Sequence, residues 1–115
     1  MIGDGSFNYN PVVGALGAAQ EHKLPIMIVI FNNPGYQSQQ GEIPHFYPAG
    51  HTVTSGNFKV SGTAIQPNPD YAQLATIYGG YGERVEKPGE VRAALERGLK
   101  AMSEGKVVLL DVRLK

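Results

Sequence analysis

Two short polar motifs follow apolar segments in the first third of the chain. Gly3-Asp4-Gly5 stands just after the N-terminus, and Asn32-Asn33 follows the apolar run at 26–31. If the two apolar segments are strands of one strand–helix–strand crossover, they run in the same direction and their carboxyl ends share one edge of a sheet. Neighbouring strands lie about 4.8 Å apart. We therefore expect Asp4 and Asn33 to lie close enough to share a ligand.

The oxygen atoms of these two side chains are suited to a hard divalent cation. Mg²⁺ takes oxygen ligands at about 2.0–2.1 Å in an octahedron, and it commonly keeps positions for phosphate oxygens and water. Gly5 and Ser6 would allow backbone N–H groups to approach an anion, and the start of the following helix adds a favourable dipole. Ligands of open α/β sheets bind at this carboxyl edge. The pair of motifs therefore predicts a Mg²⁺–phosphate site.

Each motif has a simpler interpretation when it is taken alone. Gly-Asp-Gly is a common turn, and Asn-Asn before Pro-Gly is also turn chemistry. The two motifs at the ends of one crossover are far more specific than either. They do not form a dinucleotide fingerprint, because Asn8 stands where the third glycine would be required. The lysine of a phosphate-binding P-loop is missing as well.

The rest of the chain supplies alternating helices and strands. Small residues and a proline start predict a helix over 11–23, and the continuous apolar run at 26–31 is typical of a strand buried on both faces. Asp70 caps a further helix that Gly79-Gly80 ends. Then follow a strand at 81–86, a helix from Pro88 to Gly105 and a strand at 107–112. This order predicts an α/β fold of three layers, α/β/α, with a mainly parallel sheet.

The region 34–69 breaks this alternation. Proline and glycine interrupt every long element in it, and we expect an irregular segment, a kind that is usually functional or mobile when it is this long. Only two residues precede Gly3, which is too few for a core strand. We therefore expect residues 1–115 to be a single but incomplete domain of a larger protein; the alternative is a short edge strand at the natural start.

Composition excludes several classes of function. Ten Lys and Arg balance ten Asp and Glu, so no net field favours nucleic acid or an anionic membrane as partner. Cysteine is absent, which excludes disulfides, thiolate metal sites and a cysteine nucleophile. No apolar run approaches the length that crosses a membrane. These features lead us to expect a cytoplasmic protein.

The two motifs resemble a known family. Gly3-Asp4-Gly5-Ser6-Phe7 and Phe31-Asn32-Asn33-Pro34-Gly35-Tyr36 are similar to the C-terminal, diphosphate-binding domain of thiamine-diphosphate enzymes of the acetolactate synthase, benzoylformate decarboxylase and pyruvate decarboxylase group. That family has Gly-Asp-Gly, a gap in the mid-twenties and then Asn-Asn. Residues 70–80 and 85–111 also resemble its closing elements. The resemblance is weakest over 37–68.

The resemblance implies a role for each motif residue. Mg²⁺ would be bound by the side chains of Asp4 and Asn33 and by the backbone carbonyl of Gly35. Tyr36 would either lie beside the cofactor or act as a packing aromatic, and the sequence leaves both open. The thiamine diphosphate would be held, partly through backbone groups, by Gly3, Asp4, Gly5, Ser6, Phe7, Asn33, Gly35 and Tyr36.

The resemblance also implies an activity that this chain would not complete. The resembled enzymes decarboxylate 2-keto acids or join them to a second carbonyl compound, with the cofactor supplying the chemistry. Their activating glutamate comes from a separate N-terminal pyrimidine-binding domain, usually of a neighbouring subunit in a homo-oligomer. No such motif occurs here, so no catalytic residue is assigned. We expect the chain alone to bind cofactor weakly or not at all and to catalyse nothing.

Two other functions remain open at this stage. The chain could be a non-catalytic interaction module that keeps the fold. It could also belong to another Mg²⁺–phosphate-binding α/β enzyme that uses the same edge of the sheet.

Overall fold

The computed structural model of the chain describes residues 1–114. Its centre is a sheet of four parallel strands in the order β1-β2-β4-β3. The strands are β1 (Ile2–Gly3), β2 (Met27–Asn32), β3 (Tyr81–Val85) and β4 (Val108–Arg113). The predicted parallel α/β sheet is confirmed. The two most apolar strands, β2 and β4, occupy its centre, as expected for strands that are covered on both faces.

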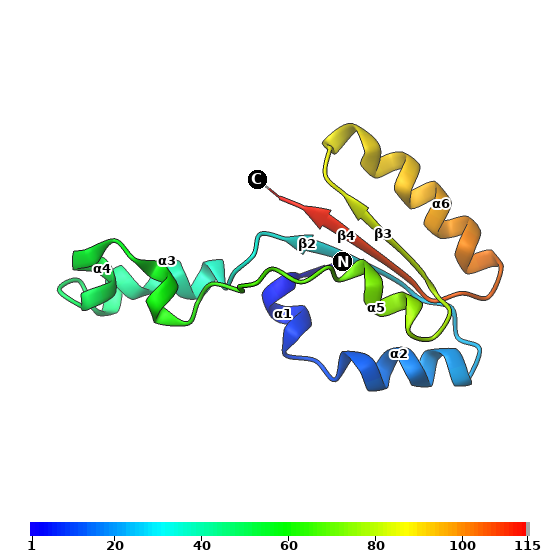
Figure 1. Cartoon of the computed structure of the whole chain (residues 1–115), viewed down its shortest axis with the longest axis horizontal. Helices are drawn as coiled ribbons and strands as arrows, with labels where there is room; N and C mark the ends of the chain where they lie inside the picture. The colour runs from blue at the N-terminus through cyan, green and yellow to red at the C-terminus, as the bar shows by residue number, and fades with distance from the viewer. Residues whose placement is uncertain (115) are drawn as a thin grey trace.

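Helices cover both faces of the sheet and give the predicted three layers (Figure 1). One face carries α1 (Asp4–Asn8), α2 (Val12–Glu21) and α5 (Ala72–Thr76). The other face carries α6 (Val91–Ser103), which follows the short 3₁₀ turn η2 (Pro88–Glu90). The region described contains no helix that is long and apolar enough to cross a membrane.

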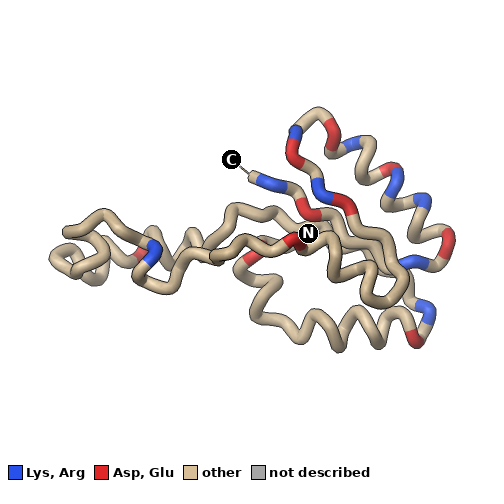
Figure 2. Tube along the Cα trace, in the orientation of Figure 1, with Lys and Arg blue, Asp and Glu red and all other residues tan. Residues whose placement is uncertain are grey.

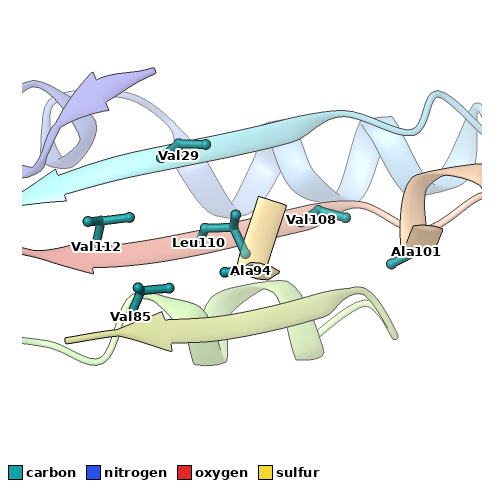
Figure 3. Packing of buried hydrophobic residues seen from close by; sticks show 7 residues of the cluster. All are labelled: Val29, Val85, Ala94, Ala101, Val108, Leu110 and Val112. Carbon is teal, nitrogen blue, oxygen red and sulfur yellow. The ribbon is translucent and has the colours of Figure 1, made fainter. Parts of the chain in front are cut away.

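The face under α6 holds one apolar cluster (Figure 3). Small residues let α6 approach the sheet closely: Ala94 is fully buried, and a Cβ at Gly98 would lie only 2.7 Å from the end of the Met27 side chain. The cluster consists of Val29, Val85, Ala94, Ala101, Val108, Leu110 and Val112.

The opposite face anchors the start of the chain. Phe7 on α1 is 3% exposed, and its ring meets the Tyr71 ring edge-on at 5.5 Å between centroids. These two rings pack with Ile30, Ala75 and Leu109. The burial of Phe7 fixes α1 against the sheet and therefore fixes the position of Asp4 at its first residue.

The start of the chain differs in detail from the prediction. Gly3-Asp4-Gly5 is not a turn, because α1 begins at Asp4 directly after the strand. The strand β1 is a two-residue edge strand that pairs Ile2 with Ile30 and Gly3 with Phe31. The helix predicted over 11–23 is the shorter α2.

The prediction of an irregular segment over 34–69 is wrong. This region contains α3 (Gln37–Phe46), α4 (His51–Ser55) and the 3₁₀ helix η1 (Phe58–Ser61). The short elements fit between the breakers: Gly56 and Gly62 adopt left-handed conformations that end α4 and η1. Pro44 lies inside α3, where it removes one intrahelical hydrogen bond, and α3 ends two residues later.

These elements form an arm, residues 35–64, that projects from the sheet (Figure 1). Its base is closed by an antiparallel bridge between Gly35 and Ala64 and by a hydrogen bond from Tyr36 N to Thr63 O of 2.8 Å. None of the residues of α3, α4 or η1 is buried. Charged residues are sparse on the arm and gather along α6 and the neighbouring strand ends (Figure 2).

Candidate functional site

The sheet brings the two polar motifs to one edge. β1 ends at Gly3, and its neighbour β2 ends at Asn32, so Asp4 and Asn33 are the first residues beyond two adjacent parallel strands. This is the arrangement predicted for the crossover. The Asp4 side chain is buried, and that of Asn33 is half-buried.

Two backbone amides hold the Asp4 carboxylate in place. Its Oδ1 accepts a hydrogen bond from the N–H of Gly5 at 2.9 Å, and its Oδ2 accepts one from the N–H of Gly35 at 3.2 Å. The carboxylate therefore ties the start of α1 to the segment that follows β2. A buried carboxylate requires such partners, because an unpaired buried charge is costly.

The Asn33 carboxamide points one of its terminal atoms at two oxygen atoms beside this carboxylate. The Asn33 Oδ1 position lies 2.9 Å from Asp4 Oδ1 and 3.0 Å from the carbonyl oxygen of Gly35. An amide oxygen in this position would face two other acceptors without a donor and be repelled by both. Two arrangements relieve the repulsion: the Asn33 carboxamide turns so that its NH₂ group donates to both oxygens, or a cation lies among them.

The spacing of these oxygens fits Mg²⁺. An octahedral Mg²⁺ with oxygens at about 2.0–2.1 Å separates adjacent ligands by about 2.8–3.0 Å, which is √2 times the metal–oxygen distance. The donor set is also appropriate, because a carboxylate, an amide oxygen and a backbone carbonyl are all hard ligands. Within residues 1–114, no three His, Cys, Asp or Glu side chains gather as a metal cluster. The oxygen donors present are therefore of the kind that Mg²⁺ takes.

A pocket of about 270 Å³ opens beside the three oxygens. Most of the predicted site residues line it: Gly3, Asp4, Gly5, Ser6, Asn33, Gly35 and Tyr36. Phe7 is not among the lining residues, because its side chain belongs to the core.

Sequence reasoning did not assign four further lining residues to the site, namely Tyr9, Gln37, Ser38 and Gln39. Tyr9 stands one helical turn after Gly5, a spacing that places two residues on one face only if this segment is helical. The three polar residues belong to the first turn of α3, a helix that the glycine and proline content concealed.

Tyr36 packs on its neighbours and also lines the pocket. Its ring covers Gly5 so closely that a Cβ there would lie 2.7 Å from Tyr36 Cδ1. The ring also lies 5.5 Å from that of Tyr9, between centroids. Tyr36 is therefore a packing aromatic that forms part of the pocket wall.

A second buried carboxylate lies beneath the site. Asp111 on β4 is fully buried, and its Oδ1 accepts a hydrogen bond from Asn32 Nδ2 at 2.8 Å. Arg113 Nη2 lies 3.1 Å from Asp111 Oδ2. Burial raises the pKa of the Asp111 carboxyl, while the Asn32 hydrogen bond and the Arg113 charge act in the opposite direction. The sequence signal for this group was a single aspartate inside the apolar run at 107–112.

Comparisons with known proteins agree with this architecture. The family model described as "Thiamine pyrophosphate enzyme, C-terminal TPP binding domain" matches residues 1–112. The large subunit of acetolactate synthase isozyme 3 from Escherichia coli K12 is 29% identical over 97% of this chain and 18% of its own length. A probable acetolactate synthase large subunit from Methanococcus aeolicus is 36% identical over 86% of this chain and 15% of its own.

A solved structure shows the same fold. The thiamine diphosphate-dependent 4-hydroxybenzoylformate decarboxylase of Rhodococcus jostii RHA1 superposes with a TM-score of 0.75 at 28% identity, over 99% of this chain and 19% of that one. The chain thus spans about a fifth of the length of the proteins it resembles.

Proposed function

Because this chain belongs to the C-terminal TPP-binding domain family of thiamine pyrophosphate enzymes, we propose that it holds the diphosphate of thiamine diphosphate through Mg²⁺. The observation that carries the proposal is that one terminal atom of the Asn33 carboxamide lies 2.9 Å from Asp4 Oδ1 and 3.0 Å from Gly35 O, a position that the amide oxygen can take when a cation is bound. Mg²⁺ at this point would take these three ligands. Phosphate oxygens and water would complete the coordination.

The pocket supplies groups for the diphosphate itself. Ser6 is exposed at the first turn of α1, where backbone N–H groups have no intrahelical acceptor. The Ser6 hydroxyl and these amides would donate to phosphate oxygens. Tyr36 and Tyr9 would form the wall toward the rest of the cofactor, since both line the pocket and pack on one another. The resemblance adds a backbone contact from Phe7.

The proposed substrate is a 2-keto acid, which the whole enzyme would decarboxylate or join to a second carbonyl compound. Bound thiamine diphosphate supplies the electron sink for that chemistry. The residues of this chain bind and orient the diphosphate end. The activating glutamate would come from an N-terminal pyrimidine-binding domain in a homo-oligomer. We therefore propose that the chain alone does not turn over pyruvate or benzoylformate.

The surface of the arm is suited to contact with another protein domain, such as the proposed N-terminal domain. Phe46 and Tyr47 at the end of α3 are 66% and 68% exposed, although aromatic side chains are usually largely buried. Glu42 and Lys59 are the only residues of the arm with a full charge at neutral pH. A nearly uncharged surface with exposed aromatics suits another protein surface better than a nucleic acid.

The test is a titration of the ¹⁵N-labelled chain, followed by NMR so that weak binding is also measured. With Mg²⁺ present, thiamine diphosphate is expected to shift the amide signals of Asp4, Ser6 and Gly35. Without Mg²⁺ the shifts should be much smaller. Asp4→Ala should abolish the Mg²⁺-dependent part, whereas Glu42→Gln on the arm, which also removes one negative charge, should not.

Three other results would argue against the proposal. Equal binding of thiamine diphosphate with and without Mg²⁺ would show that the metal does not hold the diphosphate. Stronger binding of a nucleotide than of thiamine diphosphate would indicate another Mg²⁺–phosphate function. Shifts confined to residues outside the pocket would move the ligand to a different site.

A further inference from the structure

Asp111 is a buried carboxylate that is not among the residues lining the pocket. It lies on the central strand β4, beneath the ends of the strands that precede the site. A buried ionisable group in the middle of a sheet is costly, and an apolar residue of the same size is often as stable or more stable there. Its presence therefore requires a reason other than packing.

One set of contacts links Asp111 to the segment that carries Asn33. The Nδ2 group of Asn32 donates to Asp111 Oδ1 at 2.8 Å, and both side chains are fully buried. Asn32 is the last residue of β2, and Asn33 follows it directly. The carboxylate thus fixes the point at which the chain leaves the sheet.

A second set links Asp111 to the helix that carries Asp4. Arg113 Nη2 lies 3.1 Å from Asp111 Oδ2 and donates to Pro69 O at 2.8 Å, and Pro69 stands two residues before Tyr71 in the chain. The Tyr71 ring packs on Phe7, and its hydroxyl accepts a hydrogen bond of 2.9 Å from Asn8 Nδ2. Phe7 and Asn8 belong to the five-residue helix α1 that begins at Asp4.

We propose that Asp111 is a positioning residue that holds both segments bearing the proposed Mg²⁺ ligands, an assignment that rests on the proposed function of that site. Asp111 touches neither Mg²⁺ nor cofactor in this scheme. It acts through Asn32 on Asn33, and on α1 through Arg113 and the segment 69–71, whose Tyr71 contacts Phe7 and Asn8. The Arg113 guanidinium, 19% exposed, compensates the carboxylate charge and also donates to Pro69 O at 2.8 Å.

The chemistry of the cluster requires an acceptor at this position. The Asn32 amide group and the Arg113 guanidinium are both donors, and an ionised carboxylate is an acceptor without a donor hydrogen. In Asp111→Asn, one NH₂ group must face another donor. The contact with Asn32 or the contact with Arg113 is then lost.

The experiment reads the site without metal or cofactor. The reporter is the Gly35 N–H, which donates to Asp4 Oδ2 only when the two ligand-bearing segments are in register. In Asp111→Asn, hydrogen exchange at Gly35 is expected to accelerate about tenfold more than at Val29 and Ala94, which lie in the cluster on the other face of the sheet. A residue that only stabilises the fold would accelerate all three amides equally.

Two more variants separate positioning from general destabilisation. Asn32→Ala releases only the branch toward Asn33, so exchange at Gly35 should rise while the amide of Asn8 changes little. If Asp111→Asn does not fold, Asn32→Ala alone tests whether the contact between residues 32 and 111 positions Gly35. The exchanged pair, Asn32→Asp with Asp111→Asn, restores one carboxylate and one amide in contact and keeps a carboxylate opposite Arg113. It should return Gly35 to within about twofold of the original rate.

Two results would overturn the assignment. One is unchanged protection of Gly35 in both Asp111→Asn and Asn32→Ala, and the other is an exchanged pair that is as unprotected as the single variants. Failure of thiamine diphosphate to bind would contradict the proposed function without altering these exchange rates. The two proposals can therefore fail separately.

Discussion

Replacing Asn33 by aspartate tests the oxygen trio directly. In the metal-free chain, the Asn33 carboxamide can turn its NH₂ group toward Asp4 Oδ1 and Gly35 O, with donor–acceptor distances of 2.9 and 3.0 Å. Asn33→Asp removes that donor and places a second carboxylate in the same position. The variant differs from the original by one atom and one charge, so packing is nearly unchanged.

The magnitude follows from the distance. Two unit charges 2.9 Å apart repel by about 1.4 kcal/mol in bulk water and by about 5.7 kcal/mol at the effective dielectric constant of about 20 that suits pairs near a protein surface. The site is partly open to solvent through the pocket, so we expect the metal-free chain to lose about 2–4 kcal/mol of unfolding free energy. Saturating Mg²⁺ should recover most of this loss, because a divalent cation between two carboxylates replaces repulsion by attraction.

Urea unfolding with and without Mg²⁺ measures both quantities. The control is Asn57→Asp, which makes the same change in charge on the exposed arm, where the side-chain oxygen accepts a hydrogen bond from Lys59 N that a carboxylate can also accept. The control should respond little to Mg²⁺. If Asn33→Asp is as stable as the original chain without metal, or if Mg²⁺ does not restore it, the three oxygens do not form one cation site.

Two further changes probe the surroundings of the site, and a third probes an ion pair on the edge strand β3. Gly35→Ala would place a Cβ 2.9 Å from the backbone oxygen of Thr63, so the loop must shift; we expect a stability loss of about 1–3 kcal/mol and about tenfold weaker Mg²⁺-dependent ligand binding by calorimetry. Phe7→Ala removes the ring that anchors α1 and should cost about 3–5 kcal/mol in urea unfolding. Hydrogen bonding from Arg97 lowers the pKa of Glu83 in the folded chain. The ionised Glu83 therefore adds to the free energy of unfolding at pH values above the pKa of the unfolded glutamate, and this stabilisation is lost as the pH falls through the pKa of the folded state. Glu83→Gln should therefore reduce stability at neutral pH and make little difference near pH 3, as measured by denaturant unfolding at both pH values.

The positions of Asp4 and Asn33 at two strand ends could be predicted, because they depend on the apolar pattern of each strand and on the parallel direction of strands joined by a crossover. The apolar run before Asn32 identifies a buried strand, and a crossover joins parallel strands. Those two facts place Asp4 and Asn33 at a common edge before any coordinates are known. The contribution of Gly35 came instead from family resemblance, because nothing in a Pro-Gly pair indicates where its carbonyl points.

Other parts of the site depend on contacts that the sequence does not display. Pro44 inside α3 argues against a helix, yet the cost of one missing hydrogen bond is small enough for a ten-residue helix to form. Tyr9 reaches the pocket only because α1 is helical from its first residue. Asp111 is isolated in an apolar run, and its partner Asn32 comes from a distant segment that only the folded sheet brings beside it.

The arrangement has a consequence for how a cation would bind. The Asp4 carboxylate is held by two backbone amides and is buried before any metal arrives, and the Gly35 carbonyl is fixed by the bridge at the base of the arm. Ordering a flexible loop costs about 1–2 kcal/mol per residue in backbone entropy, and a site of this kind does not incur that cost on binding. The remaining rearrangement is rotation of the Asn33 carboxamide, which exchanges two hydrogen bonds for one coordination bond. The free energy of Mg²⁺ binding should therefore depend on the identity of residue 33 more than on the flexibility of the segment around it.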